Sequence, residues 1–112
     1  MSSISTHILD TTIGKPAANV AVSLWQQKNT GWYKIADGNT DNDGRVKASW
    51  ADITIEKGLY KMYFQVDTYF ESLAVESFYP FVEVVFRVDE SVSHYHVPLL
   101  LNPFGYSTYR GS

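Results

Sequence analysis

The side chains in this sequence best suited to proton transfer are its histidines, of which there are 3. His94 and His96 lie two positions apart in the run His94-Tyr95-His96-Val97-Pro98-Leu99-Leu100-Leu101. In an extended strand these two imidazoles point to one face, while Tyr95 and Val97 point to the other. An imidazole titrates near neutral pH, so a pair that shares a face is suited to acid–base chemistry.

Metal binding is the alternative use of the same imidazoles. Zinc needs three or four ligands, and beyond His94 and His96 only His7 remains, in a chain without cysteine. The segment from Asn39 to Gly44 matches the first half of a calcium loop, but Trp50 stands where a bidentate glutamate is required. We therefore expect no metal, and favour a structural or acid–base role for the histidines.

His7 and Arg45 are further candidates whose surroundings the sequence leaves open. His7 lies in Thr6-His7-Ile8-Leu9-Asp10, where alternation does not decide whether its side chain is buried. Arg45 directly follows Asp43-Gly44 at the start of a predicted strand, a position that can hold a guanidinium in a concave site. Most arginines that follow turns are solvated, so neither residue defines a site alone.

The chain end is a third candidate feature. The terminal carboxylate of Ser112 is negative at neutral pH and follows Arg110 and the flexible Gly111. Chain ends are usually frayed, so from the residues alone an interpretation without function is favoured for this segment.

The elements that must position these residues are predicted to be strands. Short runs rich in Val, Ile, Tyr, Phe and Thr alternate with turn-forming residues in the pattern of an all-β sandwich or barrel. The predicted strands are Ile4 to Asp10, Val20 to Gln27, Trp32 to Ala36, Arg45 to Trp50, Gly58 to Val66, Phe81 to Val88, His94 to Leu101 and Gly105 to Tyr109. These eight strands favour two packed sheets.

Turns and one helix complete the predicted organisation. Residues 12–16, 28–31 and 41–44 contain Gly, Asn, Asp or Pro in the positions that turns favour. A short helix is predicted within Thr68 to Ser77, with Thr68 as its cap and Glu71 three residues later.

Composition narrows the class of protein. With 112 residues, 45% of them hydrophobic and 19% charged, the chain is long enough for one core, so one domain over residues 1–112 is expected. A net charge of -3 with scattered basic residues argues against nucleic acid as a partner. The start has neither a basic region nor an apolar run, which predicts a soluble cytoplasmic chain, or a periplasmic one if a signal peptide has been removed.

The run from His94 to Leu101 is followed at the C-terminus by Tyr106-Ser107-Thr108-Tyr109-Arg110-Gly111-Ser112. Together these motifs resemble the 5-hydroxyisourate hydrolase family of transthyretin-like proteins, and the last four residues are the most specific part. The similarity continues through Thr6-His7-Ile8-Leu9-Asp10, Gly14-Lys15-Pro16-Ala17, Thr40-Asp41-Asn42-Asp43-Gly44-Arg45 and Glu76-Ser77-Phe78-Tyr79-Pro80, so it covers nearly the whole chain. Asn102 departs from the serine expected there, outside the residues matched to catalysis.

The resemblance implies a transthyretin-like sandwich of two four-stranded sheets with one short helix. It also implies a homotetramer, built from dimers that join at sheet edges and pack face to face around a channel. The reaction it implies is hydrolysis of 5-hydroxyisourate to 2-oxo-4-hydroxy-4-carboxy-5-ureidoimidazoline in urate degradation, without a cofactor. No membrane partner is expected.

The matched positions suggest roles for individual residues. By resemblance, the catalytic set is His7, Arg45, His96 and Ser112. The substrate-binding set is Tyr109, Arg110 and Gly111, expected to reach the cavity from a neighbouring subunit. His94 shares the strand face of His96 but is not a marked position, so a supporting role is expected.

Two rival functions remain at this point. A transthyretin-like carrier would bind a small aromatic ligand in the central channel, but an apolar pocket has no need of the histidines and Arg45. A structural β-sandwich module would account for the strands and leave the C-terminal motif unexplained.

Overall fold

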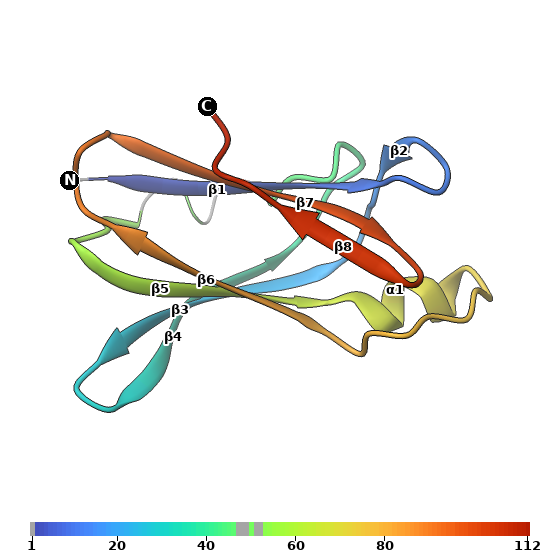
Figure 1. Ribbon diagram of the computed structural model, residues 1–112, viewed down its shortest axis with the longest axis horizontal. Helices are drawn as coiled ribbons and strands as arrows, with labels where there is room; N and C mark the ends of the chain where they lie inside the picture. The colour runs from blue at the N-terminus through green and yellow to red at the C-terminus, as the bar shows by residue number, and fades with distance from the viewer. Residues whose placement is uncertain (1, 47–49, 51–52) are drawn as a thin grey trace.

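Two four-stranded sheets pack face to face in the computed structural model, which describes residues 2–46, 50 and 53–112 (Figure 1). One sheet has the strand order β2-β1-β7-β8 and the other β4-β3-β5-β6. The elements are β1 (Ser3–Asp10), β2 (Lys15–Pro16), β3 (Ala21–Lys28), β4 (Gly31–Asn39), β5 (Gly58–Gln65), α1 (Val66–Ser72), β6 (Val82–Val88), β7 (His94–Asn102) and β8 (Gly105–Thr108). The predicted all-β sandwich with one short helix is therefore confirmed.

The two central strands of the first sheet, β1 and β7, run parallel and position the candidate residues. In β1, even-numbered side chains from Ile4 to Asp10 are buried, and the odd-numbered ones are half-buried. In β7, Tyr95, Val97 and Leu99 enter the core, as the alternation predicts. The opposite face of both strands therefore carries the histidines.

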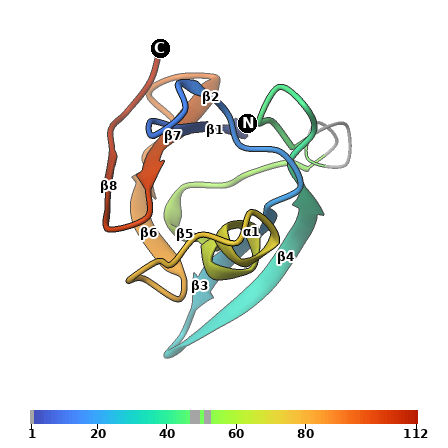
Figure 2. The ribbon, with the colours of Figure 1, turned by 90° about the vertical axis from the view of Figure 1, so that its right-hand side faces the viewer.

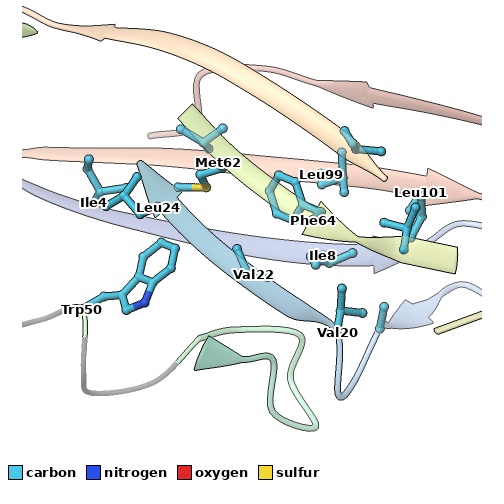
Figure 3. Packing of buried hydrophobic residues seen from close by; sticks show 14 of the residues in the cluster. Ile4, Ile8, Val20, Val22, Leu24, Trp50, Met62, Phe64, Leu99 and Leu101 are labelled. Atoms are coloured by element: carbon cyan, nitrogen blue, oxygen red, sulfur yellow. The ribbon is translucent and has the colours of Figure 1, made fainter. Parts of the chain in front are cut away.

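The core fills the space between the sheets. Figure 3 shows Ile4, Ile8, Leu99 and Leu101 of the first sheet facing side chains of β3 and β5. The buried residues of the second sheet that the figure labels are Val22, Leu24, Met62 and Phe64. Burial of these aliphatic and aromatic side chains is the main force that fixes both sheets, and with them the residues on their outer faces.

The helix α1 lies at one end of the sandwich (Figure 2) and begins and ends earlier than predicted. Its N-cap is Gln65, which makes no side-chain capping bond, and the hydroxyl of Thr68 donates to the carbonyl of Gln65 within the first turn. The predicted cap at Thr68 is therefore wrong. The helix ends because Ala74 takes a left-handed φ of 56°, and the amides of Ala74 and Val75 bond back to Glu71 and Phe70.

One predicted strand is not found and one short strand was missed. The described part of Arg45 to Trp50 contains only isolated bridges at Arg45 and Val46 and a turn at Trp50, and residues 47–49 lie outside the described residues. The two-residue strand β2 was interpreted as part of a turn, because Lys15–Pro16 is too short for an alternating pattern. It pairs with the end of β1.

The turns carry the backbone conformations that their residues predict. Gly14 and Gly44 have φ of 66° and 75°, and Asn29 has a φ of 56°. Among the described residues, no helix has the length and apolar character that a membrane crossing would need.

Candidate active site

Because β1 and β7 pair in parallel, their outward-facing side chains form two adjacent rows on the outer face of the first sheet. Ser5 is level with His96, and His7 is level with Pro98. Residues that pair across two strands point to the same face, so His7 and His96 belong to one surface. Both side chains are half-buried there.

Arg45 reaches this surface through the loop that precedes it. An antiparallel bridge joins Arg45 to His7, and the amide of Ile8 donates to the carbonyl of Gly44 at 2.9 Å. The carboxylate of Asp41 accepts bonds from the amides of Asp43 and Arg45, which closes the loop. The exposed side chain of Arg45 therefore extends from a backbone position beside His7.

Gly44 permits this close approach of the loop to β1. A β-carbon at Gly44 would come 2.5 Å from the carbonyl oxygen of Ile8 and 3.3 Å from Cδ2 of His7. The left-handed φ of Gly44 also disfavours any other residue type at this position. The turn at Asp43-Gly44 thus explains how the backbone of Arg45 comes to lie beside β1 without a regular strand.

The C-terminal tail closes the other side of His96. The amide of Gly111 donates to the carbonyl of His96 at 2.8 Å, and a β-carbon at Gly111 would lie 2.6 Å from Cδ2 of the His96 ring. The same built atom would lie 3.2 Å from Cγ of Pro98. Only a glycine lets the tail lie against this imidazole without displacing it.

The surroundings of His96 favour its neutral form. Burial lowers the pKa of His96 below its ordinary value of 6.5, and electrostatic interaction with Arg45, His94 and His7 lowers it further. A neutral imidazole can accept a proton at neutral pH, which is the state that a general base requires.

Hydroxyl groups of β1 link the two imidazoles of β7. The hydroxyl of Ser5 lies 2.7 Å from Nε2 of His94 and 2.8 Å from Nδ1 of His96. The hydroxyl of Ser3 lies 2.5 Å from Nδ1 of His94. The Ser5 hydroxyl therefore links the imidazole of His94 to the imidazole of His96.

Ser3 and Ser5 were missed in the sequence, although a signal for them exists. They share odd numbering with His7 in an alternating strand, so they must lie on its face once that strand is identified. What the sequence could not supply is the parallel register that brings them beside His94 and His96.

The remaining tail residues separate into different surroundings. The guanidinium of Arg110 lies 5.4 Å from the centre of the Tyr95 ring, which belongs to the core side of β7. Arg110 and Tyr109 line a cavity of about 280 Å³ at the edge of the sandwich, with Phe86 and Arg87 of β6. Ser112 is exposed at the end of the chain.

The structure therefore brings together His7, Arg45, His96 and Gly111, while the guanidinium of Arg110 lies over the Tyr95 ring, beside a cavity that His96 also lines. Gly111 contacts His96 of its own chain, and the approach of the tail to the site of a neighbouring subunit stays a prediction. In the described part of the chain, no group of three or more His, Asp or Glu side chains is arranged to hold a metal ion.

A two-sheet sandwich that carries imidazoles and a guanidinium on the outer face of one sheet defines the class: a β-sandwich protein with a polar surface site beside its C-terminal tail. Residues 4–111 match the family model described as the HIUase/Transthyretin family. The chain belongs to this family, which confirms the resemblance inferred from its motifs.

Individual relatives agree with this membership. The chain is 48% identical to the 5-hydroxyisourate hydrolase of Salmonella dublin over 109 residues, which cover 97% of this chain and 80% of the relative. It is similar in structure to the 5-hydroxyisourate hydrolase of Klebsiella pneumoniae, with a TM-score of 0.85 and 35% identity over 100% of this chain and 94% of the other. It is also similar to sea bream transthyretin in complex with thyroxine, with a TM-score of 0.90 and 32% identity over 97% and 94% of the two chains.

Proposed function

We propose that this chain is an enzyme that hydrolyses 5-hydroxyisourate to 2-oxo-4-hydroxy-4-carboxy-5-ureidoimidazoline in urate degradation. The observation that carries the proposal is the placement of His7, Arg45 and His96 on one face beside the tail at Gly111. The relatives named as 5-hydroxyisourate hydrolases supply the substrate class. The similarity to a thyroxine-bound transthyretin leaves the carrier as the rival function.

The reaction is the opening of a cyclic amide by water. In the proposed mechanism, His7 and His96 hold a water molecule and remove one of its protons as the water oxygen bonds to a ring carbonyl carbon. The carbon–nitrogen bond of the six-membered ring then breaks, and the departing nitrogen takes the proton. A lowered pKa for His96 supports this role, because the neutral imidazole is the form that accepts a proton.

Arg45 is the group proposed to stabilise the developing negative charge. Its guanidinium is charged at any working pH and presents several N–H donors in one plane, which suits the oxygen-rich edge of a urate-like ring. A donor aimed at the carbonyl oxygen stabilises the tetrahedral intermediate more than the flat substrate, and so lowers the barrier. The bridge between Arg45 and His7 keeps base and donor adjacent.

The C-terminal residues are proposed to complete the site. Gly111 already lies against His96, and Ser112 follows with a hydroxyl that can orient substrate or water. Tyr109 and Arg110 are proposed to bind substrate in a neighbouring subunit, since Arg110 is turned toward Tyr95 in its own chain.

We also propose that the working form is a homotetramer, a dimer of dimers. The strands β6 and β8 lie at the edges of their sheets, and Val85 and Tyr106 on them are exposed together with Phe104 of the adjoining loop. Edge strands with unpaired backbone groups and exposed apolar side chains favour pairing with another copy. A second dimer facing the histidine surface would shield that surface from bulk water.

The direct test is to add the protein to freshly generated, carbon-labelled 5-hydroxyisourate and follow the carbonyl carbon by NMR. We expect a carboxylate signal to replace the ring carbonyl signal faster than in the spontaneous reaction without protein. A folded tetramer that leaves this rate unchanged and binds thyroxine would overturn the enzyme in favour of the carrier. Sedimentation equilibrium, expected to give four times the chain mass, tests the assembly.

A further inference from the structure

The serine hydroxyls of β1 and the imidazoles of β7 form one continuous chain of hydrogen-bonding groups. It runs from Nδ1 of His96 to Ser5, to Nε2 of His94, from Nδ1 of His94 to Ser3, and on to the carbonyl of Ser93. The last link is the longest, at 3.5 Å from the Ser3 hydroxyl. Within the described residues, Nε2 of His96 has no hydrogen-bond partner and is the open end of the chain.

Counting donors restricts how protons are arranged along this chain. A hydroxyl has one proton to donate, and a neutral imidazole has one N–H and one acceptor nitrogen. Ser5 lies between two ring nitrogens, so it donates to one of them and accepts from the other. With both imidazoles neutral, the tautomers of His94 and His96 are therefore coupled through a single hydroxyl, and two arrangements satisfy the three links between the serines and the rings.

The Ser93 end of the chain selects between the two arrangements. A backbone carbonyl can only accept, so the hydroxyl of Ser3 donates to Ser93 and accepts from Nδ1 of His94. Nε2 of His94 is then unprotonated and accepts from Ser5, and Ser5 in turn accepts from Nδ1 of His96. The reverse arrangement would break the link from the Ser3 hydroxyl to the Ser93 carbonyl, which also accepts from the Ser3 amide at 3.0 Å.

We propose that Ser5, supported by His94, is a positioning residue that holds His96 in its Nδ1–H tautomer and leaves the lone pair of Nε2 free to deprotonate water. This inference rests on the proposed hydrolase function and assigns the base role to His96 rather than His7. It also gives His94 its task, which is to accept the proton of Ser5. The groups that face His96 are Ser5 of β1, Gly111 of the tail, and the side chains of Arg45, His94 and His7.

The size of the expected loss of kcat follows from what the Ser5 hydroxyl does to the tautomer of His96. A histidine base locked in the wrong tautomer loses up to ~10⁴ in kcat, as in a serine protease triad. Ser5→Ala leaves His96 free to adopt either tautomer, so the expected loss is smaller, about tenfold in kcat, with KM nearly unchanged. Ser5→Thr keeps the hydroxyl on a strand that tolerates a β-branched residue and is expected to restore most of the activity.

The test combines kinetics with NMR of the full-length protein carrying isotope-labelled histidine. With only 3 histidines in the chain, each ring can be assigned by single substitution. We expect His94 and His96 to be Nδ1–H tautomers in the parent and in Ser5→Thr, and His96 to be a mixture in Ser5→Ala. Ser23→Ala, which removes a hydroxyl bonded to Trp25 in the other sheet, is the matched control and should change neither readout.

Three results would overturn the inference. The first is an Nε2–H tautomer of His96 in the parent, and the second is a tautomer unchanged by Ser5→Ala. The third is a tautomer change with kcat at the parent level. A failure of the hydrolase function is distinguishable: the parent would show no turnover while its His96 tautomer still responded to Ser5→Ala, which keeps the tautomer assignment and removes its catalytic use.

Discussion

Gly111 lies directly against the imidazole of His96, so close that a single added β-carbon would come 2.6 Å from Cδ2 of the ring. The contact joins the end of the chain to the middle of β7 and is fixed by a hydrogen bond from the Gly111 amide to the His96 carbonyl. The absence of a side chain at Gly111 therefore determines where the imidazole of His96, the proposed base, can lie.

Gly111→Ala is expected to lower kcat by about 100-fold, because a displacement of roughly 1 Å in a catalytic group has a cost of that order. The steady-state rate of 5-hydroxyisourate hydrolysis measures it. Gly105→Ala is the matched control, since its β-carbon would be 3.6 Å from the Asn102 side chain, an ordinary contact. Equal activity in the two variants would contradict the role given to the Gly111 contact.

Gly44→Ala is expected to destabilise the fold more than Gly14→Ala. Both glycines have a left-handed φ, which costs an alanine about 1–2 kcal/mol. At Gly44 the new methyl group also meets the Ile8 carbonyl at 2.5 Å, whereas Gly14 has nothing within 4 Å. Urea unfolding of both variants should therefore show a larger loss for Gly44→Ala, and similar losses would speak against the close approach of this loop to β1.

The pH dependence of kcat/KM is expected to follow His96 of the free protein. Its pKa lies below 6.5, so falling pH protonates the base and the midpoint of the loss of activity lies below that value. At pH 6.5 the rate should exceed half of its plateau. The same lowered pKa means that the unfolded chain binds more protons, so the stability contributed by neutral His96 is present above 6.5 and declines as pH falls through the folded pKa.

NMR titration of the His96 ring provides the comparison for this profile. The kinetic midpoint and the ring midpoint should agree, and both should rise when added salt screens the exposed Arg45. A kinetic midpoint above 6.5, or one that differs from that of His96, would assign the base to another group.

An extension after Ser112 is expected to reduce activity without loss of stability. The tail beyond Gly111 is exposed and is not part of the core, so added residues should leave the unfolding midpoint in place. They would crowd the substrate position beside His96. Full activity with a long C-terminal extension would show that Ser112 has no part in catalysis.

The sequence was sufficient for the strands that alternate clearly and for the shared face of His94 and His96, because a period of two fixes which side chains face the core. It was insufficient where long-range geometry decides. The parallel register of β1 and β7 creates the link from Ser5 to His96, and no local pattern encodes it. Arg45 was expected on a strand, yet a tight loop that depends on Gly44 holds it.

The C-terminal tail is a second case in which the sequence motif does not determine where each side chain lies. The tail was assigned to the site by motif, and Gly111 does lie at His96. Arg110 belongs to the same motif but turns to the Tyr95 ring, because adjacent residues of an extended tail point in opposite directions.

The most direct measurement of the central claim is the absorbance decay of freshly generated 5-hydroxyisourate with the parent protein, with His96→Ala and with His94→Ala. The account predicts acceleration by the parent, a loss of about 10²–10⁴-fold in His96→Ala, the range contributed by a positioned base, and a smaller loss in His94→Ala. Decay at the spontaneous rate with the folded parent, or parent-level acceleration by His96→Ala, would contradict it.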